Sequence, residues 1–246
     1  MEELKKASHF KKFYVNSYES DKNLELKMNC LFQWFSEIAW EHAKQLNLGF
    51  EDLEETEYYW VLLGMNVKIN KLPQWQDEVL LQTWPSAVSG LYFMREFILF
   101  DSEGEMLAGA SSAWLIYNRA TSRPVIPKGA EYEYTVNSHR ATDQDFSKLR
   151  QRKDLLPGLN VTARYTDIDM HRHVNNAVYI KWIENYLGDL HPGRIDTVKI
   201  QYMKEIKLND EIDLLFGNED DIYYCEAVIR GEYKTSFRAE VKVEKS

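Results

Sequence analysis

The sequence predicts an α+β fold made of two tandem copies of one unit, each a short strand, a helix and several further strands. Two observations carry this prediction: the same order of elements occurs twice along the 246 residues, and residue types recur in register between the halves. The composition agrees, because 44% hydrophobic and 13% aromatic residues can bury a sizeable core.

In the first half, a short strand at Val15 leads through a polar turn at 21–23 into a helix. One helical face is apolar apart from one histidine, with spacings of three and four residues. Its members are Leu31, Trp34, Phe35, Ile38, Ala39 and His42. Strands are predicted over residues 60–69, 78–84, 92–100 and 108–117, and the turn 101–104 predicts a hairpin.

The second half starts near Asn160 with a short strand, followed by a polar segment and a helix. The apolar side of this helix holds Val178, Tyr179, Trp182, Ile183 and Tyr186. Strands are predicted over residues 197–205, 211–216, 222–229 and 235–243, with turns at 217–220 and 230–231.

Matching residues indicate that the halves arose by duplication of a unit of about a hundred residues. At an offset of 146 (167 − 21), the matches are Val15 with Val161, Asp21 with Asp167 and Asn29 with Asn175. At an offset of 133 (210 − 77), residues 77–79 match 210–212.

The second copy holds the groups suited to chemistry. Asp167, Asp169, His171 and His173 fall on every second residue, so an extended chain would project them from one face. Carboxylates and imidazoles together favour acid–base catalysis near neutral pH. By the two offsets, Asn23, Glu25 and Lys27 stand opposite residues 169, 171 and 173, and Leu72 stands opposite Glu205. We therefore expect the second copy to be catalytic and the first to be scaffold and pocket wall.

Charge and composition exclude several classes of protein. A formal net charge of −9 argues against a nucleic-acid binder, whose surface would be basic. There is no 18-residue apolar run for a membrane span, and the first residues lack the apolar stretch of a secretory signal. The two cysteines, Cys30 and Cys225, do not form a disulfide framework or a metal motif, and both are expected in the core. These features predict a cytoplasmic protein.

Residues 164–179 closely resemble the signature R-x-x-D-L/I-D-x-N-x-H-V-N-N-x-x-Y of acyl-[acyl carrier protein] thioesterases of the plant and bacterial oleoyl type. Residues 201–205 resemble the family's Y-x-x-E segment. Similarities in the first half extend the resemblance to roughly residues 10–245, at positions 60–62, 72–79, 83–86, 95–97 and 112–114.

The resemblance implies a double hotdog, in which each hotdog is a long helix wrapped by a curved antiparallel sheet. It implies an N-terminal, non-catalytic hotdog at 8–130 that holds the acyl chain. It further implies a linker at 131–156 and a catalytic C-terminal hotdog at 157–246. The implied reaction is hydrolysis of the thioester between a fatty acyl chain and the carrier protein's phosphopantetheine, within fatty acid biosynthesis and lipid metabolism.

By position, Asp169, His173 and Glu205 match the family's catalytic Asp, His and Glu, and His171 stands where the family usually has Asn. Ile206 replaces the Cys of plant members, which excludes a cysteine nucleophile at that place. We expect Glu205 or Asp169 to take the proton from water and His173 to orient the water or protonate the leaving thiol. Backbone N–H groups of residues 174–176 would bind the oxyanion.

Asn175 and Asn176 are candidates for substrate binding and, equally, for helix caps. Trp60 is a candidate substrate-binding residue, and we expect bulky first-half side chains to line the tail tunnel. These are Trp34, Trp60, Met65 and Trp84. Asp167 is better explained as a turn or cap residue. A metal site formed by Asp169, His171, His173 and Glu205 is a less favoured alternative, and no cofactor is expected.

The expected partner is an acylated acyl carrier protein, which is acidic, so docking requires a local basic patch. The basic run at 148–153 is the candidate, with Arg194, Lys199 or Lys204 as additions. Two other functions remain open: an acyl-CoA thioesterase with the same catalytic groups, and a non-catalytic acyl-binding hotdog. Two fused hotdogs allow either a monomer or a homodimer.

Overall fold

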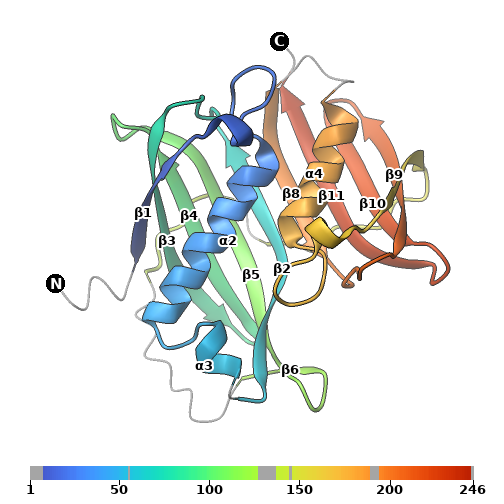
Figure 1. The fold of residues 1–246 in the computed structure, drawn as a ribbon, viewed down its shortest axis with the longest axis horizontal. Coiled ribbons are helices and arrows are strands. Elements are labelled where there is room, and N and C mark those ends of the chain that lie inside the picture. Colours follow the sequence, from blue (N-terminus) through green and yellow to red (C-terminus); the bar gives the residue numbers. More distant parts are fainter. Residues whose placement is uncertain (1–7, 55, 127–136, 144–145, 189–193, 245–246) are drawn as a thin grey trace. The chain divides into compact units, whose positions relative to one another are not determined.

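The computed structural model describes residues 8–54, 56–126, 137–143, 146–188 and 194–244, and the chain forms two compact units (Figure 1). The first unit comprises residues 1–27 and 33–146, and the second comprises residues 28–32 and 147–246. Each unit combines a helix with an antiparallel sheet, which confirms the predicted fold class. The predicted domain borders stay a prediction, since residues 127–136 lie outside the described part.

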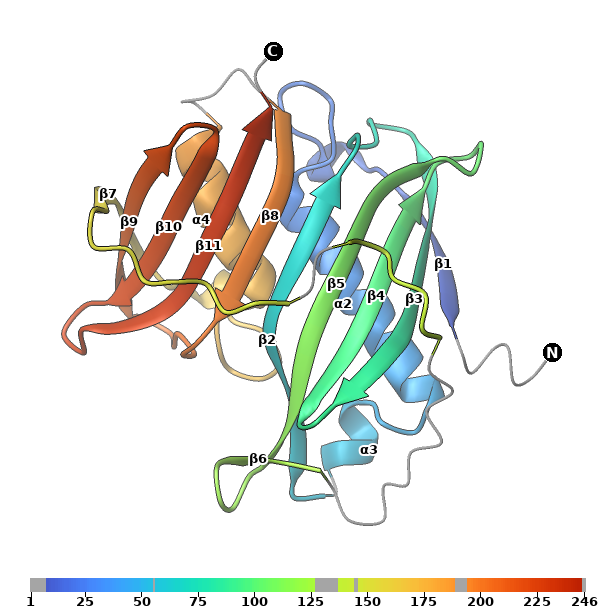
Figure 2. The ribbon, with the colours of Figure 1, turned by 180° about the vertical axis from the view of Figure 1, so that it is seen from behind.

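The first unit is a five-stranded antiparallel sheet with the order β1-β3-β4-β5-β2, and the short β6 pairs with β5. The helix α2 crosses one face of this sheet (Figures 1 and 2). The elements are β1 (His9–Tyr14), η1 (Ser17–Glu19), α2 (Met28–Gln45), α3 (Phe50–Glu54), β2 (Tyr58–Ile69), β3 (Glu78–Ser89), β4 (Tyr92–Phe100), β5 (Met106–Asn118) and β6 (Arg123–Val125).

The apolar face predicted for α2 is buried over its whole length, including His42. Phe35 of α2 packs on Phe97 of β4, with ring centroids 5.0 Å apart. The predicted hairpin between β4 and β5 is confirmed, because the Asp101 carboxylate accepts the backbone N–H groups of Glu103 and Glu105. Period-based prediction works here because one face of each element packs against the core.

The second unit is a five-stranded antiparallel sheet with the order β8-β11-β10-β9-β7, crossed on one face by the helix α4 (Figure 1). Its elements are β7 (Leu156–Thr162), η2 (Tyr165–Asp167), α4 (Asn176–Leu187), β8 (Arg194–Tyr202), β9 (Glu211–Glu219), β10 (Ile222–Ile229) and β11 (Lys234–Glu244). No helix among the residues described here is long and apolar enough to span a bilayer.

The packing of α4 follows the predicted apolar face. Tyr186 stacks on Phe216 of β9 with ring centroids 3.6 Å apart. Gly158 of β7 leaves room for this pair, because a Cβ there would lie 2.4 Å from the Phe216 ring and 3.0 Å from Tyr186. The remaining predicted residues of this face are fully buried.

Equivalent backbone features show that the first parts of the units match at an offset of 148, so the predicted offset of 146 is wrong. The turns η1 and η2 start at residues 17 and 165 (165 − 17 = 148). The left-handed residues Leu24 and Arg172, both at φ 67°, have the same separation (172 − 24 = 148). The later offset of 133 is confirmed: Leu26 donates to the Pro73 carbonyl as Val174 donates to that of Ile206 (206 − 73 = 133).

The corrected register changes which residues correspond. Asp169 matches Asp21 (169 − 21 = 148), and the glutamate opposite His173 is Glu25 (173 − 25 = 148). Asp167 matches Glu19, whose carboxylate likewise accepts the N–H three residues earlier. The identical residue types at an offset of 146 do not mark equivalent positions, because different side chains can make the hydrogen bonds that define these turns.

Candidate functional site

The site lies at the start of α4, where residues 165–175 fold into two successive turns. The prediction of an extended segment is wrong: residues 165–167 form the 3-10 turn η2, and a tight turn follows. The carboxylate of Asp167 accepts the Arg164 N–H at 2.9 Å, and its carbonyl accepts the Asn175 N–H at 2.9 Å. Asp167 is buried, so it is the cap residue that the sequence analysis predicted.

Asp169 shapes the second turn. Its carboxylate accepts the backbone N–H of His171 at 2.9 Å, its N–H donates to the His173 carbonyl, and its carbonyl accepts the N–H of Arg172. Asp21 builds the same kind of turn in the first unit, which lacks the glutamate and histidine of the second. The carboxylate of Asp169 therefore has a demonstrable structural role, and its predicted catalytic role remains a proposal.

His173 and Glu205 come together as an acid–base pair. The His173 Nε2 atom lies 2.9 Å from a carboxylate oxygen of Glu205. The two side chains are 30% and 53% exposed, so both are accessible to solvent. Glu205 lies beyond the end of β8 and not inside a strand as predicted, because β8 ends at Tyr202. The bond from the Val174 N–H to the Ile206 carbonyl, 2.9 Å long, holds the two segments side by side.

The hydroxyl of Tyr179 lies within electrostatic range of both carboxylates. Burial raises the pKa of Tyr179 well above its ordinary value. Hydrogen bonds to the Ser236 side chain and the Ile206 backbone act in the opposite direction, and the charges of Glu205 and Asp169 raise the pKa further. Sequence analysis placed Tyr179 only on the apolar face of the helix, since helical periodicity carries no information about its hydroxyl group.

The N-terminus of α4 offers fewer free donors than predicted. Asn175 is the N-cap, because its side-chain oxygen accepts the Ala177 N–H at 2.9 Å. The N–H groups of Val174 and Asn175 donate to the carbonyls of Ile206 and Asp167, so they cannot bind an oxyanion. Asn176 is the first residue of the helix, and its N–H remains a candidate for binding the oxyanion. Its carbonyl accepts the Tyr202 hydroxyl at 3.2 Å.

Among the described residues, no group of three or more His, Cys, Asp and Glu side chains is arranged to hold a metal ion. The ligand set considered from the sequence is therefore not assembled in this part of the chain. Cys30 and Cys225 are both buried and unpaired with each other, and burial raises the pKa of the Cys225 thiol.

An apolar pocket lies in the first unit between α2 and the sheet. The space between its walls, including space open to solvent, is about 550 Å³. Trp60 lines it and packs edge-on against Phe93, with ring centroids 5.2 Å apart. The other lining residues are Ala39, Trp40, Ala43, Leu46, Pro85, Ala87, Val88, Met94, Arg95 and Trp114.

The other bulky residues predicted to line the tunnel are outside this pocket. Trp34, Met65 and Trp84 are buried in the core of the first unit. The indole of Trp34 donates to Glu19, and that of Trp84 donates to the His139 carbonyl. The sequence shows which side chains are large, but it does not separate those that fill the core from those that line a cavity.

Comparisons with known proteins assign both halves of the chain to one family. Residues 6–128 match the family model described as "Acyl-ACP thioesterase N-terminal domain", and residues 151–245 match "Acyl-ACP thioesterase C-terminal domain". The chain is 27% identical over 237 residues to an oleoyl-acyl carrier protein thioesterase of Arabidopsis thaliana, covering 87% of this chain and 65% of the relative. A palmitoyl-acyl carrier protein thioesterase of the same plant is 29% identical over 209 residues. The match covers 78% of this chain and 51% of the relative.

Solved structures show the same architecture. An acyl-ACP thioesterase from Bacteroides thetaiotaomicron superposes with a TM-score of 0.90 at 25% identity, covering 99% of this chain and 100% of the other. The 12:0-ACP thioesterase from Umbellularia californica superposes with a TM-score of 0.84 at 22% identity. The match covers 97% of this chain and 98% of the other. The chain spans about half to two thirds of the length of the two plant relatives.

Proposed function

The chain belongs to the acyl-ACP thioesterase family, and we propose that it hydrolyses the thioester between a fatty acyl chain and an acyl carrier protein. The observation that carries the proposal is the contact of 2.9 Å between His173 and Glu205, at the start of α4. It joins two accessible groups able to accept and donate protons, which is what hydrolysis by an activated water requires.

In the proposed reaction, Glu205 takes a proton from water while His173 orients that water. The oxygen adds to the acyl carbon, and the carbonyl oxygen becomes an oxyanion near the N–H of Asn176, at the positive end of the α4 dipole. The carbon–sulfur bond then breaks, the fatty acid leaves, and the phosphopantetheine sulfur receives a proton from His173. The short contact with Glu205 resupplies that proton, so the pair is restored after each turnover.

We place the acyl chain in the apolar pocket of the first unit, with Trp60 as a wall. An apolar lining recovers the free energy of removing methylene groups from water, about 0.8 kcal/mol for each. His171 and Asp169 remain candidates for contact with the thioester, since both lie on the turn that carries His173.

Docking of the carrier is the second part of the proposal. The basic run at 148–153 lies on the sheet face opposite α4 (Figure 2). Leu149 bonds to the side chain of Gln201, and Arg152 is held between Asp154 and Glu219. The positive charge of Arg152 is therefore compensated, and the run faces away from the helix that carries the site.

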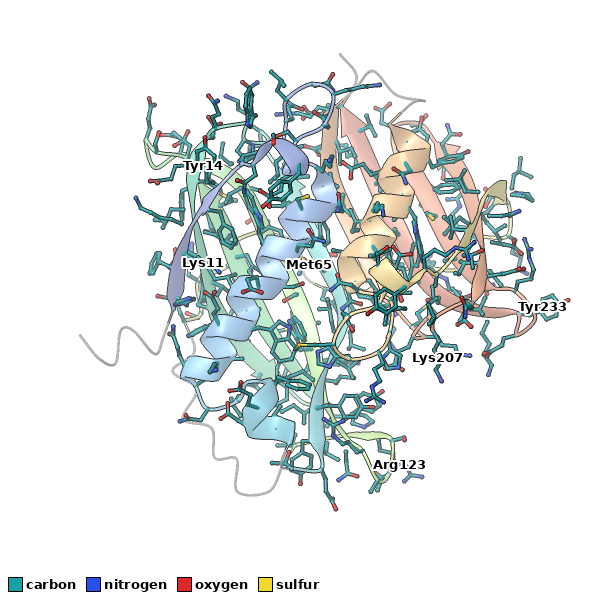
Figure 3. All side chains as sticks on the ribbon, in the orientation of Figure 1. Lys11, Tyr14, Met65, Arg123, Lys207 and Tyr233 are labelled. Atoms are coloured by element: carbon teal, nitrogen blue, oxygen red, sulfur yellow. The ribbon has the colours of Figure 1, made fainter. Side chains whose placement is uncertain are left out.

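A better candidate surface surrounds the site itself. Arg164, Arg172 and Lys207 are exposed, and the described residues offer none of them an ion-pair partner. Lys207 projects from the edge of the second unit (Figure 3). Arg164 precedes the two turns before α4, Arg172 lies in the second of them, and Lys207 follows Glu205 by two residues. We propose that these three cations attract the acidic carrier protein.

The test is release of free fatty acid from a panel of acyl-carrier and acyl-CoA substrates by the wild type, His173→Ala and Glu205→Gln. We expect turnover of the carrier-linked substrates, with a collapse in both variants. Preference for CoA substrates would favour the acyl-CoA alternative, and no turnover by the wild type would favour the non-catalytic acyl-binding alternative. A cytoplasmic location stays a prediction; both plant relatives are named chloroplastic.

A further inference from the structure

Glu205 stands on a segment without regular secondary structure, so something other than a strand must fix its direction. β8 ends at Tyr202, and residues 203–206 continue without pairing as a strand. The side chain is half exposed and therefore little restrained by packing. Its position opposite His173 must come from the two peptide groups that flank it, between residues 204 and 205 and between 205 and 206.

Ser236 of β11 holds the first of these peptide groups. Its buried hydroxyl donates to the Lys204 carbonyl at 2.6 Å. The Ser236 carbonyl also accepts the N–H groups of Met203 at 2.8 Å and of Lys204 at 3.0 Å. One residue thus makes three hydrogen bonds to the backbone just before Glu205.

Tyr179 of α4 contacts the second peptide group, between residues 205 and 206. Its hydroxyl bonds to the Ser236 side chain and to the Ile206 backbone. Both contacts lower the pKa of Tyr179, against the effect of burial. The hydroxyl groups of Tyr179 and Ser236 thus form a chain of polar contacts from Ile206 to Lys204, around Glu205.

The first unit contains the same bend without this chain. There Asn70 and Lys71 donate to the Leu107 carbonyl at 2.9 and 3.1 Å, as Met203 and Lys204 donate to Ser236 (203 − 70 = 133). Leu107 therefore stands in place of Ser236, and Leu72 in place of Glu205. The offset of 148 puts Leu31 in place of Tyr179 (179 − 31 = 148).

Tyr179, Ser236 and Glu205 are therefore present together in the second copy of the repeat, and leucine replaces all three in the first copy. Pro73, which has no N–H to donate, stands in place of Ile206 (206 − 73 = 133). The bend in the backbone does not need the hydroxyl groups, because the first unit forms it with none. The hydroxyl groups accompany the glutamate.

We infer that Tyr179 and Ser236 are positioning residues, whose hydroxyl groups fix both peptide groups around Glu205 and so hold its carboxylate against His173. The inference rests on the proposed function for its catalytic consequence. Its geometric content, that the hydroxyl groups determine where Glu205 lies, stands independently of the activity.

Tyr179→Phe and Ser236→Ala remove one hydroxyl each and should leave the fold intact. The Tyr179 ring is held by Phe237 and Trp182, with centroids 5.0 and 5.5 Å away. We expect kcat to fall about tenfold in each variant, with KM changed less than about twofold, because the catalytic geometry and not substrate binding is disturbed. Ile200→Val in β8 is the control: it should lower Tm by removing a buried methylene and keep kcat.

A second arm asks whether the hydroxyl groups act through Glu205. In a Glu205→Gln background, adding Tyr179→Phe should cause no further loss of kcat, since the group being positioned is already inactive. An equal, tenfold loss in both backgrounds would show an independent role and overturn the inference. Full activity of Tyr179→Phe and Ser236→Ala, with Glu205→Gln inactive, would overturn it while leaving the proposed function intact.

Crystal structures of the two variants provide a readout that needs no turnover. The inference expects the His173 Nε2 to Glu205 carboxylate distance to exceed about 3.5 Å, beyond hydrogen-bond range. An unchanged distance in both variants would overturn it even if the wild type proved inactive on every thioester. Inactivity of the wild type with a lengthened distance in the variants would refute the proposed function alone.

Discussion

Asp169 and Asp21 occupy equivalent places in the two units, and each accepts the backbone N–H of the residue two positions later at 2.8 to 2.9 Å. The turn that presents His173 thus occurs in both copies and is not specific to the proposed catalytic site. A second bond in the first unit, from the Glu25 N–H to Asp21, reinforces its turn. The proposed catalytic histidine therefore stands on a loop whose shape both copies share.

Removing either aspartate should destabilise its own unit by a similar amount. For Asp21→Ala and Asp169→Ala we expect a loss of about 1 kcal/mol each in the free energy of unfolding, the usual cost of deleting a side-chain cap of backbone N–H groups. Urea unfolding measures this. Asp143→Ala, at an exposed position outside both turns, is the control. A loss confined to Asp169→Ala would contradict the equivalence of the turns.

Replacing Glu205 by Gln or His173 by Ala should lower kcat by at least about a hundredfold, the lower range for loss of general acid–base catalysis. Both side chains are accessible, so Tm should change little. Steady-state release of fatty acid measures the first quantity and thermal unfolding the second. Glu211→Gln, an exposed acid paired with Arg230, is the matched control and should retain full kcat.

The pocket predicts a change in chain-length preference. Trp60→Leu enlarges the space beside Phe93 and should favour longer acyl chains, whereas Ala43→Leu fills it from α2 and should favour shorter ones. The measurement is kcat/KM across a series of acyl-carrier substrates. Trp75→Leu removes an exposed indole outside the pocket and should leave the profile unchanged. Identical profiles in all three variants would place the acyl chain elsewhere.

Charge reversal should separate the two candidate docking surfaces. Arg172→Glu with Lys207→Glu should raise KM for a carrier-linked substrate several-fold, and KM for a small acyl thioester should stay unchanged. The effect should weaken as salt rises, because screening reduces attraction between exposed charges. Arg150→Glu with Lys153→Glu, on the opposite face of the sheet, is the control. A larger effect from this control pair would restore the basic run at 148–153 as the docking site.

The buried hydroxyl of Tyr179 predicts a dependence of stability on alkaline pH. Burial raises its pKa in the folded state, so the unfolded chain releases the proton first. The stability it contributes is complete below the ordinary tyrosine pKa of about 10 and is lost as pH rises above that value. Urea unfolding between about pH 8 and pH 11 should show a shallower decline for Tyr179→Phe than for the wild type. Tyr233→Phe, at an exposed site, should not alter the slope.

Much of the fold could be predicted because the spacing of apolar residues along a helix or strand indicates which face is buried. The buried faces of α2 and α4 lie where helical spacing places them. The turn before α4 could not be predicted this way. Its left-handed residue is Arg172 and not glycine, and its closing bonds depend on Asp169 and on backbone groups. Alternation of polar residues predicted a strand where local side-chain hydrogen bonds form a turn instead.

The candidate site was partly visible in the sequence. The family motif brought together His173 and Glu205, and the contact between them agrees with it. The sequence could not reveal that Arg152 is neutralised by Asp154 and Glu219, because Glu219 is distant along the chain. Nor could it separate Trp60, which lines a cavity, from Trp84, which fills the core.

The leucines at positions 31, 72 and 107 distinguish the first copy from the proposed catalytic site of the second at three places at once. Leu72 is nearly inaccessible to solvent, so a glutamate restored there alone would place a carboxylate in an apolar setting with neither hydroxyl present, at a cost of several kcal/mol. A second site of the proposed kind in the first copy would therefore require changes at all three leucines together, and no single substitution supplies it.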